Sequence, residues 1–219
     1  MDFNPLDIKP SKKSLVYLNG KSKRSIDILG ALAGILLGIP IFLTAAAVVK
    51  LVDKVPVLFF QERVGLMGRT FTIMKLRTLR VVETRNMVNP DRIHRKPIYE
   101  TTKTGAFWRR TSIDEIIQFF LVLKGDMSLI GHRPIPAYYI PHLASLDGMD
   151  TSKVEHYLRV IYQYKPGMSS LSAVKGRGRL TMQEKMMCDL YYAQKAGFSY
   201  DVKLLVQTLF VVITQKGAL

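Results

Sequence analysis

Two adjacent carboxylates, Asp114 and Glu115, stand just before an apolar run and are the strongest candidates for chemistry in this chain. A carboxylate can attack phosphorus or bind Mg²⁺, and neighbouring cations stabilise the charge on a phosphoryl group in transfer. The pair has such neighbours, because Arg109 precedes it and Arg133 follows it in a glycine-punctuated loop stiffened by Pro134. These residue types predict phosphoryl chemistry.

The same pair also has a purely structural interpretation. Ser112 and Glu115 have the spacing of a capping box, in which each side chain accepts a hydrogen bond from the other residue's backbone N–H. Acids in a first helical turn also stabilise a helix by roughly 0.3–1 kcal/mol each. The pattern therefore predicts a helix from Ser112 to about Lys124, ended by Gly125. The sequence does not decide whether Glu115 caps this helix or takes part in catalysis.

Other catalytic patterns are missing from the sequence. The four histidines have no compact metal-ligand spacing, and neither a G-x-S-x-G nucleophile elbow nor a P-loop occurs. Gly65 and Gly68 lack the third glycine of a dinucleotide fingerprint. Cys188 is the only cysteine, which excludes an internal disulfide and a cysteine-rich zinc site and fits a reducing compartment.

The charge balance points to an anionic partner. The chain has 32 Lys and Arg against 17 Asp and Glu, a formal charge of +15, together with 48% hydrophobic residues. A basic protein with surplus apolar residues fits an anionic membrane, where each basic residue near the surface adds about 1 kcal/mol. Nucleic acid would also attract this charge, but no RNA-binding motif or recognition helix is evident. We expect a lipid partner and no nucleic acid; a non-catalytic basic membrane-surface or nucleic-acid-binding protein is the alternative to an enzyme.

Residues 28–49 form an uncharged apolar segment long enough to cross a hydrocarbon core of roughly 30 Å. Basic residues flank both ends, Lys23 and Arg24 before and Lys50 after, so the positive-inside rule prefers neither side. Pro40 removes one helical hydrogen bond and predicts a kink. A kinked helix that enters and leaves by one face satisfies both facts, and a single span is the alternative. Lys23 and Arg24 are expected at lipid head groups, as anchors or as contacts for a lipid phosphate.

The segment after this helix predicts a small β-hairpin. Residues 57–61 and 70–75 have strand character and are separated by a glycine-containing turn. Lys75 and Arg77 then belong to a basic cluster that either binds an anion or forms a solvated charged surface. Residues 83–105 are polar and contain prolines, which predicts a loop.

The C-terminal part predicts three helices. Residues 150–163 and 181–196 look helical and flank a loop rich in Gly, Lys and Arg that carries Arg177. Residues 200–213 are mostly apolar but too short to span comfortably, which favours an amphipathic helix in the membrane interface. The predicted fold is α+β and mostly helical. It comprises three parts. Residues 1–22 form an N-terminal tail, and residues 23–50 form a re-entrant membrane helix broken at Pro40. Residues 51–219 form a cytosolic, membrane-associated catalytic domain with a small hairpin and interfacial amphipathic helices.

Several ordered sequence blocks resemble the bacterial sugar transferases, the monotopic phosphoglycosyl transferases that start glycan assembly on a polyprenol carrier. The resemblance covers about Lys23 to Ile213 and rests on five blocks: KRSID, FFQERVGLMGRTFTIMKLRTL, RRTSIDEIIQ, VLKGDMSLIGHRP and YKPGMSSLSAVKGRG. Several blocks in one order are far more specific than any single motif.

The resemblance implies a role for each matching residue. Asp114 would attack the β-phosphate of a nucleotide diphosphosugar, which the family pattern leads us to expect is a UDP-sugar, and Glu115 would hold Mg²⁺. Undecaprenyl phosphate would then take the phosphosugar from the aspartate. Arg109 and Arg133 would bind phosphate. The remaining residues that we assign to substrate binding are Lys75, Arg77, Gln118, Lys23, Arg24 and Arg177, and those assigned structural roles are Pro40, Ser112 and Pro134.

The resemblance further implies a bacterial inner membrane location with the catalytic domain on the cytoplasmic face. The chain departs from the usual family pattern at Ile117, Leu121 and His132 and in the loop of residues 169–174, so the donor sugar stays open. Longer members carry extra N-terminal transmembrane helices, and we expect this chain to be the minimal catalytic form. A homo-oligomer and an inactive scaffold both stay open as well.

Overall fold

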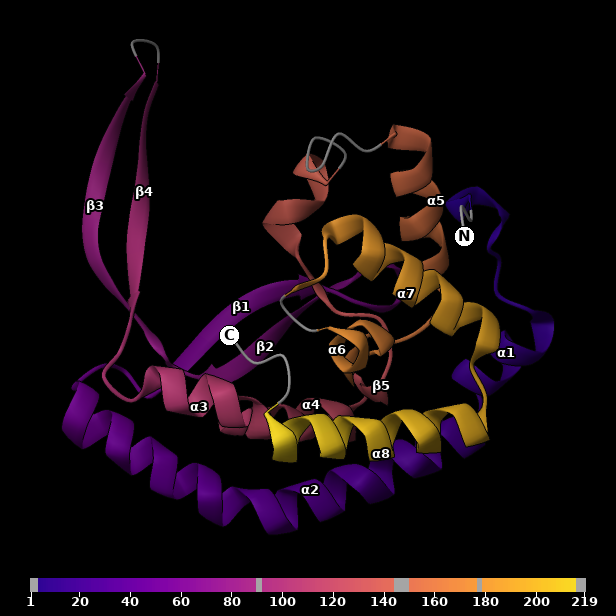
Figure 1. Cartoon of the computed structure of the whole chain (residues 1–219), viewed down its shortest axis with the longest axis horizontal. Coiled ribbons are helices and arrows are strands. Elements are labelled where there is room, and N and C mark those ends of the chain that lie inside the picture. Colours follow the sequence, from indigo (N-terminus) through magenta and orange to yellow (C-terminus); the bar gives the residue numbers. More distant parts are fainter. Residues whose placement is uncertain (1–3, 90–91, 144–149, 177–178, 216–219) are drawn as a thin grey trace.

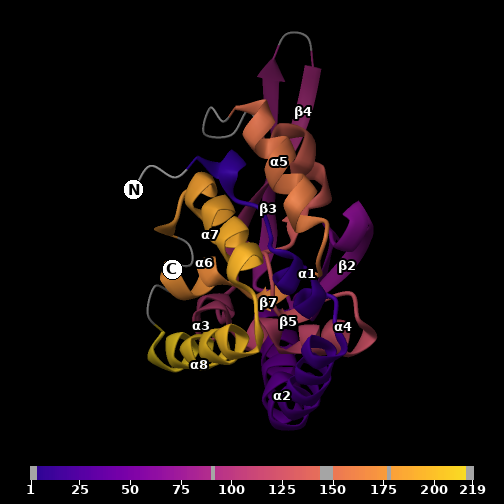
Figure 2. The ribbon, with the colours of Figure 1, turned by 90° about the vertical axis from the view of Figure 1, so that its right-hand side faces the viewer.

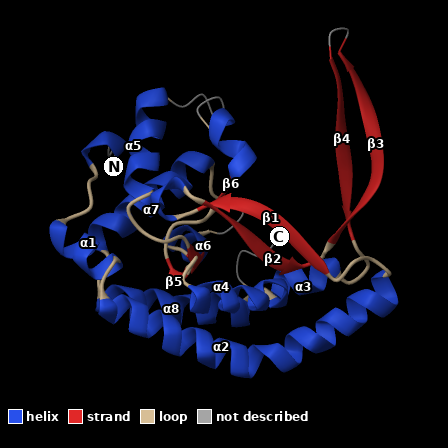
Figure 3. Ribbon diagram, turned by 180° about the vertical axis from the view of Figure 1, so that it is seen from behind, coloured by secondary structure: helices blue, strands red, loops and turns tan. Residues whose placement is uncertain are grey.

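The computed structural model describes residues 4–89, 92–143, 150–176 and 179–215, apart from the side chains of residues 83–98. The fold is mostly helical with small sheets, as predicted (Figures 1 and 3). Its α- and 3₁₀-helices, with one π-helical turn (η2), are η1 (Pro5–Asp7), α1 (Lys12–Leu18), α2 (Lys21–Val48), η2 (Val49–Asp53), η3 (Leu66–Gly68), α3 (Gly105–Thr111), η4 (Ile113–Gln118), α4 (Phe119–Lys124), η5 (Ala137–His142), α5 (Thr151–Ile161), α6 (Leu171–Lys175), α7 (Met182–Lys195) and α8 (Phe198–Thr214). Its strands are β1 (Leu58–Val64), β2 (Thr70–Leu76), β3 (Leu79–Asn89), β4 (Arg92–Thr101), β5 (Ser128–Ile130), β6 (Ile135–Pro136) and β7 (Gly167–Ser169).

Helix α2 forms the base of the molecule and contains the predicted apolar segment. It is long and apolar enough to cross a membrane, and most of its apolar segment is not buried inside the protein. The expected break at Pro40 does not interrupt it: the helix continues through this residue and bends as an arc (Figure 1). A proline removes only one main-chain hydrogen bond, so the bonds on either side keep the helix continuous.

A row of glycines lets α2 approach the rest of the protein closely. They recur every fourth residue and therefore share one helical face: Gly30, Gly34 and Gly38. A Cβ added at position 34 would lie 2.4 Å from the Phe119 ring, and one added at position 38 would lie 2.7 Å from Ile116 Cγ2. Both neighbours belong to the segment of η4 and α4 that follows the carboxylate pair. The glycine row therefore sets the position of that segment.

We expect Gly34→Leu to destabilise the protein by about 1–3 kcal/mol, the usual cost of overpacking a close contact. The leucine side chain would have to displace the Phe119 ring, which lies against Gly34. Thermal unfolding in detergent micelles measures the change. Ala33→Leu is the matched control, because Ala33 is exposed on the other face of the same helical turn. Equal melting temperatures for the two variants would contradict this packing.

The predicted hairpin is confirmed and delivers Lys75. Strands β1 and β2 pair antiparallel from Leu58 opposite Leu76 to Val64 opposite Thr70, and β6 adds to the other edge of β1. The turn between them includes Gly68 at φ +73°, a backbone conformation that favours glycine. Lys75 lies near the end of β2, opposite Phe59.

The predicted loop over residues 83–105 is wrong. Most of this segment belongs to a second antiparallel hairpin, β3 and β4, which projects away from the helical body (Figure 1). Its β-branched residues favour strands. Pro97 lies opposite Thr84, and a two-stranded ribbon tolerates proline because each strand has an open edge that needs no ladder hydrogen bond.

A buried polar network joins the two helices at the base to the body. Asp201, in the first turn of α8, is completely buried and accepts hydrogen bonds from Tyr17 Oη at 2.8 Å, Tyr192 Oη at 2.8 Å and Lys23 Nζ at 2.6 Å. These three donors come from α1, α7 and α2. One carboxylate therefore fixes the meeting point of four helices.

A second acid completes this network. Asp27 lies one turn after Lys23 on α2, and their charged atoms are 3.5 Å apart. Its carboxylate also accepts hydrogen bonds from Ser128 Oγ at 2.9 Å and the Leu129 backbone N–H at 3.0 Å. The beginning of α2 is thus tied through β5 to the interior of the protein.

Candidate active site

The carboxylate pair lies on a tight turn between two short helices. Helix α3 ends at Ser112, which has the left-handed conformation φ 59°, ψ 15°, and Asp114 and Glu115 follow in the first turn of the 3₁₀-helix η4. The predicted single helix from Ser112 to Lys124 is therefore wrong, although its end at Gly125 is confirmed, with φ 100°. The left-handed conformation of Ser112 costs on the order of 1–3 kcal/mol for a residue other than glycine, and such residues are typical of functional sites.

The predicted capping box is also wrong. The Ser112 side chain makes no capping hydrogen bond to η4, because its left-handed backbone does not give the extended geometry of an N-cap. A capping box of that kind does exist elsewhere in the chain, between Thr181 and Glu184 at the start of α7. The Glu115 carboxylate instead forms an ion pair with Lys75.

A cavity of about 630 Å³ brings the predicted chemical residues together. Its wall includes both carboxylates and three of the predicted cations: Asp114, Glu115, Lys75, Arg109 and Arg133. These residues come from η4, β2, α3 and the loop after β5. The wall also includes Ser172 and Lys185, from α6 and α7, which the sequence did not single out because they stand far from the carboxylates along the chain.

Asp114 has the environment of a tuned carboxylate. Its side chain is only 7% exposed, and its pKa is raised to about 7. Burial is the main cause, the negative charge of Glu115 adds to it, and the charges of Lys75 and Arg109 oppose it. The group is thus poised to change between the neutral and ionised forms near neutral pH.

If Asp114 is the nucleophile, as the resemblance implies, we expect the rate of its step to rise with pH and to level off above about pH 7. Only the ionised carboxylate is a nucleophile, so below this pKa the rate should fall about tenfold per pH unit. Nucleotide release measured between pH 5 and 9 tests this expectation. A raised pKa in the folded state also means that ionising Asp114 weakens folding as pH rises from its ordinary value of 3.8 through 7.

A second buried carboxyl serves as the control for this pH profile. The pKa of Asp189 is also raised to about 7, chiefly by burial, while Tyr157 and Arg133 oppose the shift. Asp189→Asn should keep the midpoint of the activity profile. Loss of the midpoint in this variant would assign the titration to Asp189 instead of Asp114.

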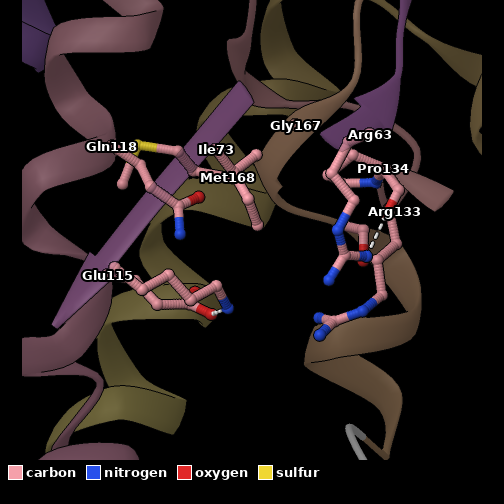
Figure 4. Close-up of a pocket in the computed structure, with 10 residues that line it drawn as sticks. Arg63, Ile73, Glu115, Gln118, Arg133, Pro134, Gly167 and Met168 are labelled. Carbon is pink, nitrogen blue, oxygen red and sulfur yellow. Dashed lines mark hydrogen bonds and ion pairs between the residues drawn. The ribbon is translucent and has the colours of Figure 1, made fainter. Parts of the chain in front are cut away.

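Glu115 points into the site and forms an ion pair with Lys75 (Figure 4). Both side chains are partly exposed, at 28% and 19%. Among the described residues there is no group of three or more metal-ligating side chains. Two adjacent carboxylates still suit Mg²⁺, which commonly binds one or two carboxylates together with substrate phosphates. Asp114 and Glu115 therefore fit an ion shared with substrate.

A small pocket of about 20 Å³ continues behind Glu115 and is rich in hydrogen-bond donors. Gln118 and Glu115 lie on one side of it, opposite Arg63 and Arg133 (Figure 4). Gln118 Nε2 is buried and has no hydrogen-bond partner in the part of the chain that the structure describes. Arg63 donates to the Pro134 carbonyl at 2.7 Å. Gln118 and Pro134 both line this pocket. Their roles, beside substrate and in shaping the loop, stay predictions.

The loop that carries Arg133 is supported from beneath. His132 is fully buried and packs edge-on against Tyr164, with ring centroids 5.2 Å apart. Burial lowers its pKa to about 4, so the imidazole is neutral. Arg133 itself is exposed toward the cavity. A buried residue at the base of the loop thus supports an exposed, charged side chain.

Lys23 and Arg24 do not lie where the sequence suggested. Lys23 is 3% exposed and is held by Asp27 and Asp201, so it is not at a lipid head group. Arg24 donates hydrogen bonds of 2.5 Å to the carbonyls of Val122 and Leu123. It therefore satisfies the C-terminal end of α4, where main-chain carbonyls lack helical partners.

Another predicted residue, Arg77, does not line the cavity. Arg77 donates to the carbonyls of Pro56 and Leu58, both at 3.0 Å, and thereby holds the beginning of β1. Arg177 lies outside the described residues. On α2, the cavity is lined by Ile41 rather than by its neighbour Pro40.

This site has a buried carboxylate among cations, close to a long apolar helix. Such an arrangement indicates a membrane-associated enzyme that acts on phosphates. The chain belongs to the bacterial sugar transferase family, which it matches over residues 18–215. This match confirms the resemblance and identifies the protein as a transferase.

Named relatives cover most of this chain. It is 33% identical to the uncharacterised sugar transferase EpsL of Bacillus subtilis, over 89% of each chain. It is 32% identical to the UDP-glucose:undecaprenyl-phosphate glucose-1-phosphate transferase of Caulobacter vibrioides, over 98% of this chain and 82% of the relative. The Escherichia coli protein of the same name is 32% identical over 92% of this chain, which spans 42% of that longer relative.

Proposed function

We propose that the protein transfers a sugar-1-phosphate from a UDP-sugar to undecaprenyl phosphate through a phosphosugar bound to Asp114. The observation that carries this proposal is the buried carboxylate of raised pKa that shares one cavity with Lys75, Arg109 and Arg133. The names of the Caulobacter and Escherichia relatives support the choice of donor and acceptor. The product, an undecaprenyl diphosphate sugar, would start the assembly of a glycan.

The first step forms the covalent intermediate. An oxygen of the ionised Asp114 attacks the β-phosphorus of the UDP-sugar, and a bond from the aspartate oxygen to phosphorus forms. The bond from the β-phosphorus to the bridging oxygen breaks, and that oxygen leaves with its electron pair as part of UMP. Arg109, Lys75 and Arg133 stabilise the negative charge on the phosphates as it shifts toward the leaving group.

The second step releases the aspartate. A phosphate oxygen of undecaprenyl phosphate attacks the phosphorus of the intermediate, and the bond between phosphorus and the Asp114 oxygen breaks. The carboxylate is restored in its ionised form. Two displacements at the same phosphorus allow one cavity to serve both substrates in turn, as in other covalent mechanisms.

Magnesium is the cofactor that these residues suit. Glu115, with Asp114 beside it, would hold the ion, and Lys75 would exchange its ion pair with Glu115 for contact with substrate phosphate. A bound Mg²⁺ would supply positive charge to the diphosphate. The cations of the cavity wall would stabilise the remaining negative charge of the phosphates.

The exposed apolar faces of α2 and α8 support attachment to a membrane. Leu36 and Leu37 on α2 are more than 70% exposed, and Ile213 on α8 is 78% exposed. Both helices run along the base of the molecule (Figures 1 and 2). We infer that α2 enters and leaves the inner membrane from the cytoplasmic face, with α8 lying in the interface, because the two ends of the arc rise toward the same catalytic body.

A panel of nucleotide sugars tests the proposed function. The purified protein, in detergent or lipid with Mg²⁺ and undecaprenyl phosphate, should release UMP with at least one UDP-sugar. The lipid product should carry the sugar and one additional phosphate. A folded protein that releases no nucleotide with any donor of a broad panel would overturn the proposal.

We expect Glu115→Gln to lower turnover by about 10²-fold or more while the protein remains folded, because an amide is a poor ligand for Mg²⁺. The apparent affinity for Mg²⁺, measured by titrating the ion against UMP release, should fall with it. Glu62→Gln, an exposed substitution on β1, is the control. A Glu115→Gln enzyme with an unchanged Mg²⁺ requirement would assign the metal to another group.

A further inference from the structure

The cavity has two chemically different sides. The polar side holds the carboxylates and cations described above. The other side is apolar and is built by α2, α8 and the segment of η4 and α4 that follows the carboxylate pair, which we call the catalytic segment. Its residues are Ile41, Ile116, Phe119, Leu209, Val211 and Val212. A nucleotide sugar is polar along most of its length, and only its uracil ring has apolar faces, so most of such a surface suits a different ligand.

The apolar side is continuous with the outside of the protein. Leu209 is 62% exposed and Ile41 is 51% exposed, yet both line the cavity. Neighbouring Val206 and Phe210 on α8 are also strongly exposed. The cavity therefore opens between α2 and α8, at the base of the molecule where both helices present apolar faces (Figures 1 and 2).

The position of α8 at this opening is fixed by a polar contact. Thr208 lines the cavity, and its Oγ1 lies 2.7 Å from Ser169 Oγ of β7 and 2.7 Å from the Leu204 carbonyl. Ser169 also lines the cavity. The wall that carries Leu209 is thus tied to the wall that faces the substrate phosphates.

We propose that the opening between Ile41 and Leu209 binds the first isoprene units of the polyprenyl phosphate acceptor. This inference rests on the proposed function and assigns the two sides of the cavity to the two ends of one substrate. The phosphate reaches the cations beside Asp114, while the first units of the chain contact the apolar side. A cavity of about 630 Å³ has room for these units together with the phosphate, and the remaining chain extends into the lipid.

Two adjacent residues of α8 allow a matched test. Leu209 and Phe210 are 62% and 60% exposed, so a polar substitution at either position removes a similar apolar contact with lipid. Of the two, Leu209 lines the cavity and Phe210 does not. Leu209→Asn and Phe210→Asn are compared in lipid nanodiscs. Two quantities are measured: the burst of UMP release without acceptor, and the KM for undecaprenyl phosphate and for the short-chain farnesyl phosphate.

We expect Leu209→Asn to raise the KM for both acceptors by roughly 5–20-fold, since the side chain loses contact with the chain nearest the phosphate. The UMP burst, which does not involve the acceptor, should change much less than this KM does. Phe210→Asn should leave both quantities unchanged.

Three results would overturn the inference. Equal KM increases for the two variants, or an increase with undecaprenyl phosphate alone, would assign the effect to membrane attachment. An unchanged KM in Leu209→Asn would mean that the acceptor does not occupy the opening and would favour a phospholipid acyl chain there. Absence of a UMP burst in the wild type would instead refute the covalent step on which the inference rests, so the two failures are distinguishable.

Discussion

Asp114→Asn is expected to abolish turnover, with a loss of about 10³-fold or more, because an amide cannot serve as the nucleophile toward phosphorus. The side chain is nearly the same size, so the buried site should keep its packing. The wild type incubated with the UDP-sugar and Mg²⁺ but no acceptor should gain the mass of a phosphosugar. The variant should not. Intact-protein mass spectrometry and UMP release measure the two outcomes.

The control for this experiment is Glu62→Gln, which also neutralises an acid but lies exposed on β1, away from the cavity wall. It should keep full activity and the covalent adduct. Substantial turnover in Asp114→Asn, or an adduct that persists in it, would remove the aspartyl intermediate from the mechanism. The family membership would be unaffected by that result.

Lys23→Met is expected to destabilise the protein by about 3–5 kcal/mol, since it leaves two buried carboxylates without their cation. Asp27 is 2% exposed and Asp201 is 0% exposed. Thermal unfolding in micelles should show a melting temperature lowered by roughly 6–20 °C for a chain of this size. Lys23→Met combined with Asp201→Asn should recover part of the loss, because the double variant removes charges of both signs.

Lys21→Met is the matched control, since Lys21 lies two residues earlier on the same helix and is exposed. It should melt close to the wild type. If Lys23→Met melted with it and instead raised the KM for undecaprenyl phosphate, Lys23 would be a lipid phosphate contact, as the sequence had suggested. The structure places it in the interior instead.

The local chemistry of the site could be predicted because its residues stand in short contiguous motifs. Asp114, Glu115 and Arg109 lie within one turn region, so any compact fold keeps them close. The first hairpin was also predictable from strand-like runs on either side of a glycine turn. Lys75 was a candidate only as part of a basic cluster, and its spacing could not place it beside the acids, since it lies 40 residues before Glu115.

The parts that failed depend on contacts between distant segments. A lysine beside an apolar helix suggests a lipid head group, and only the fold reveals that Asp201 is its partner 178 residues away. The left-handed Ser112 breaks a pattern that reads as one continuous helix, because tertiary packing outweighs local helix signals. The hairpin of β3 and β4 was hidden by proline, which a sheet tolerates only where an edge is open.

The glycine row on α2 has a consequence for how the enzyme responds to its surroundings. Because Phe119 and Ile116 lie against Gly34 and Gly38 and also line the cavity, a change in the curvature of α2 would displace part of the cavity wall. Bilayer thickness acts on such a helix through hydrophobic mismatch. If α2 lies in the membrane as proposed, we expect the thickness of the bilayer to affect the geometry around Asp114.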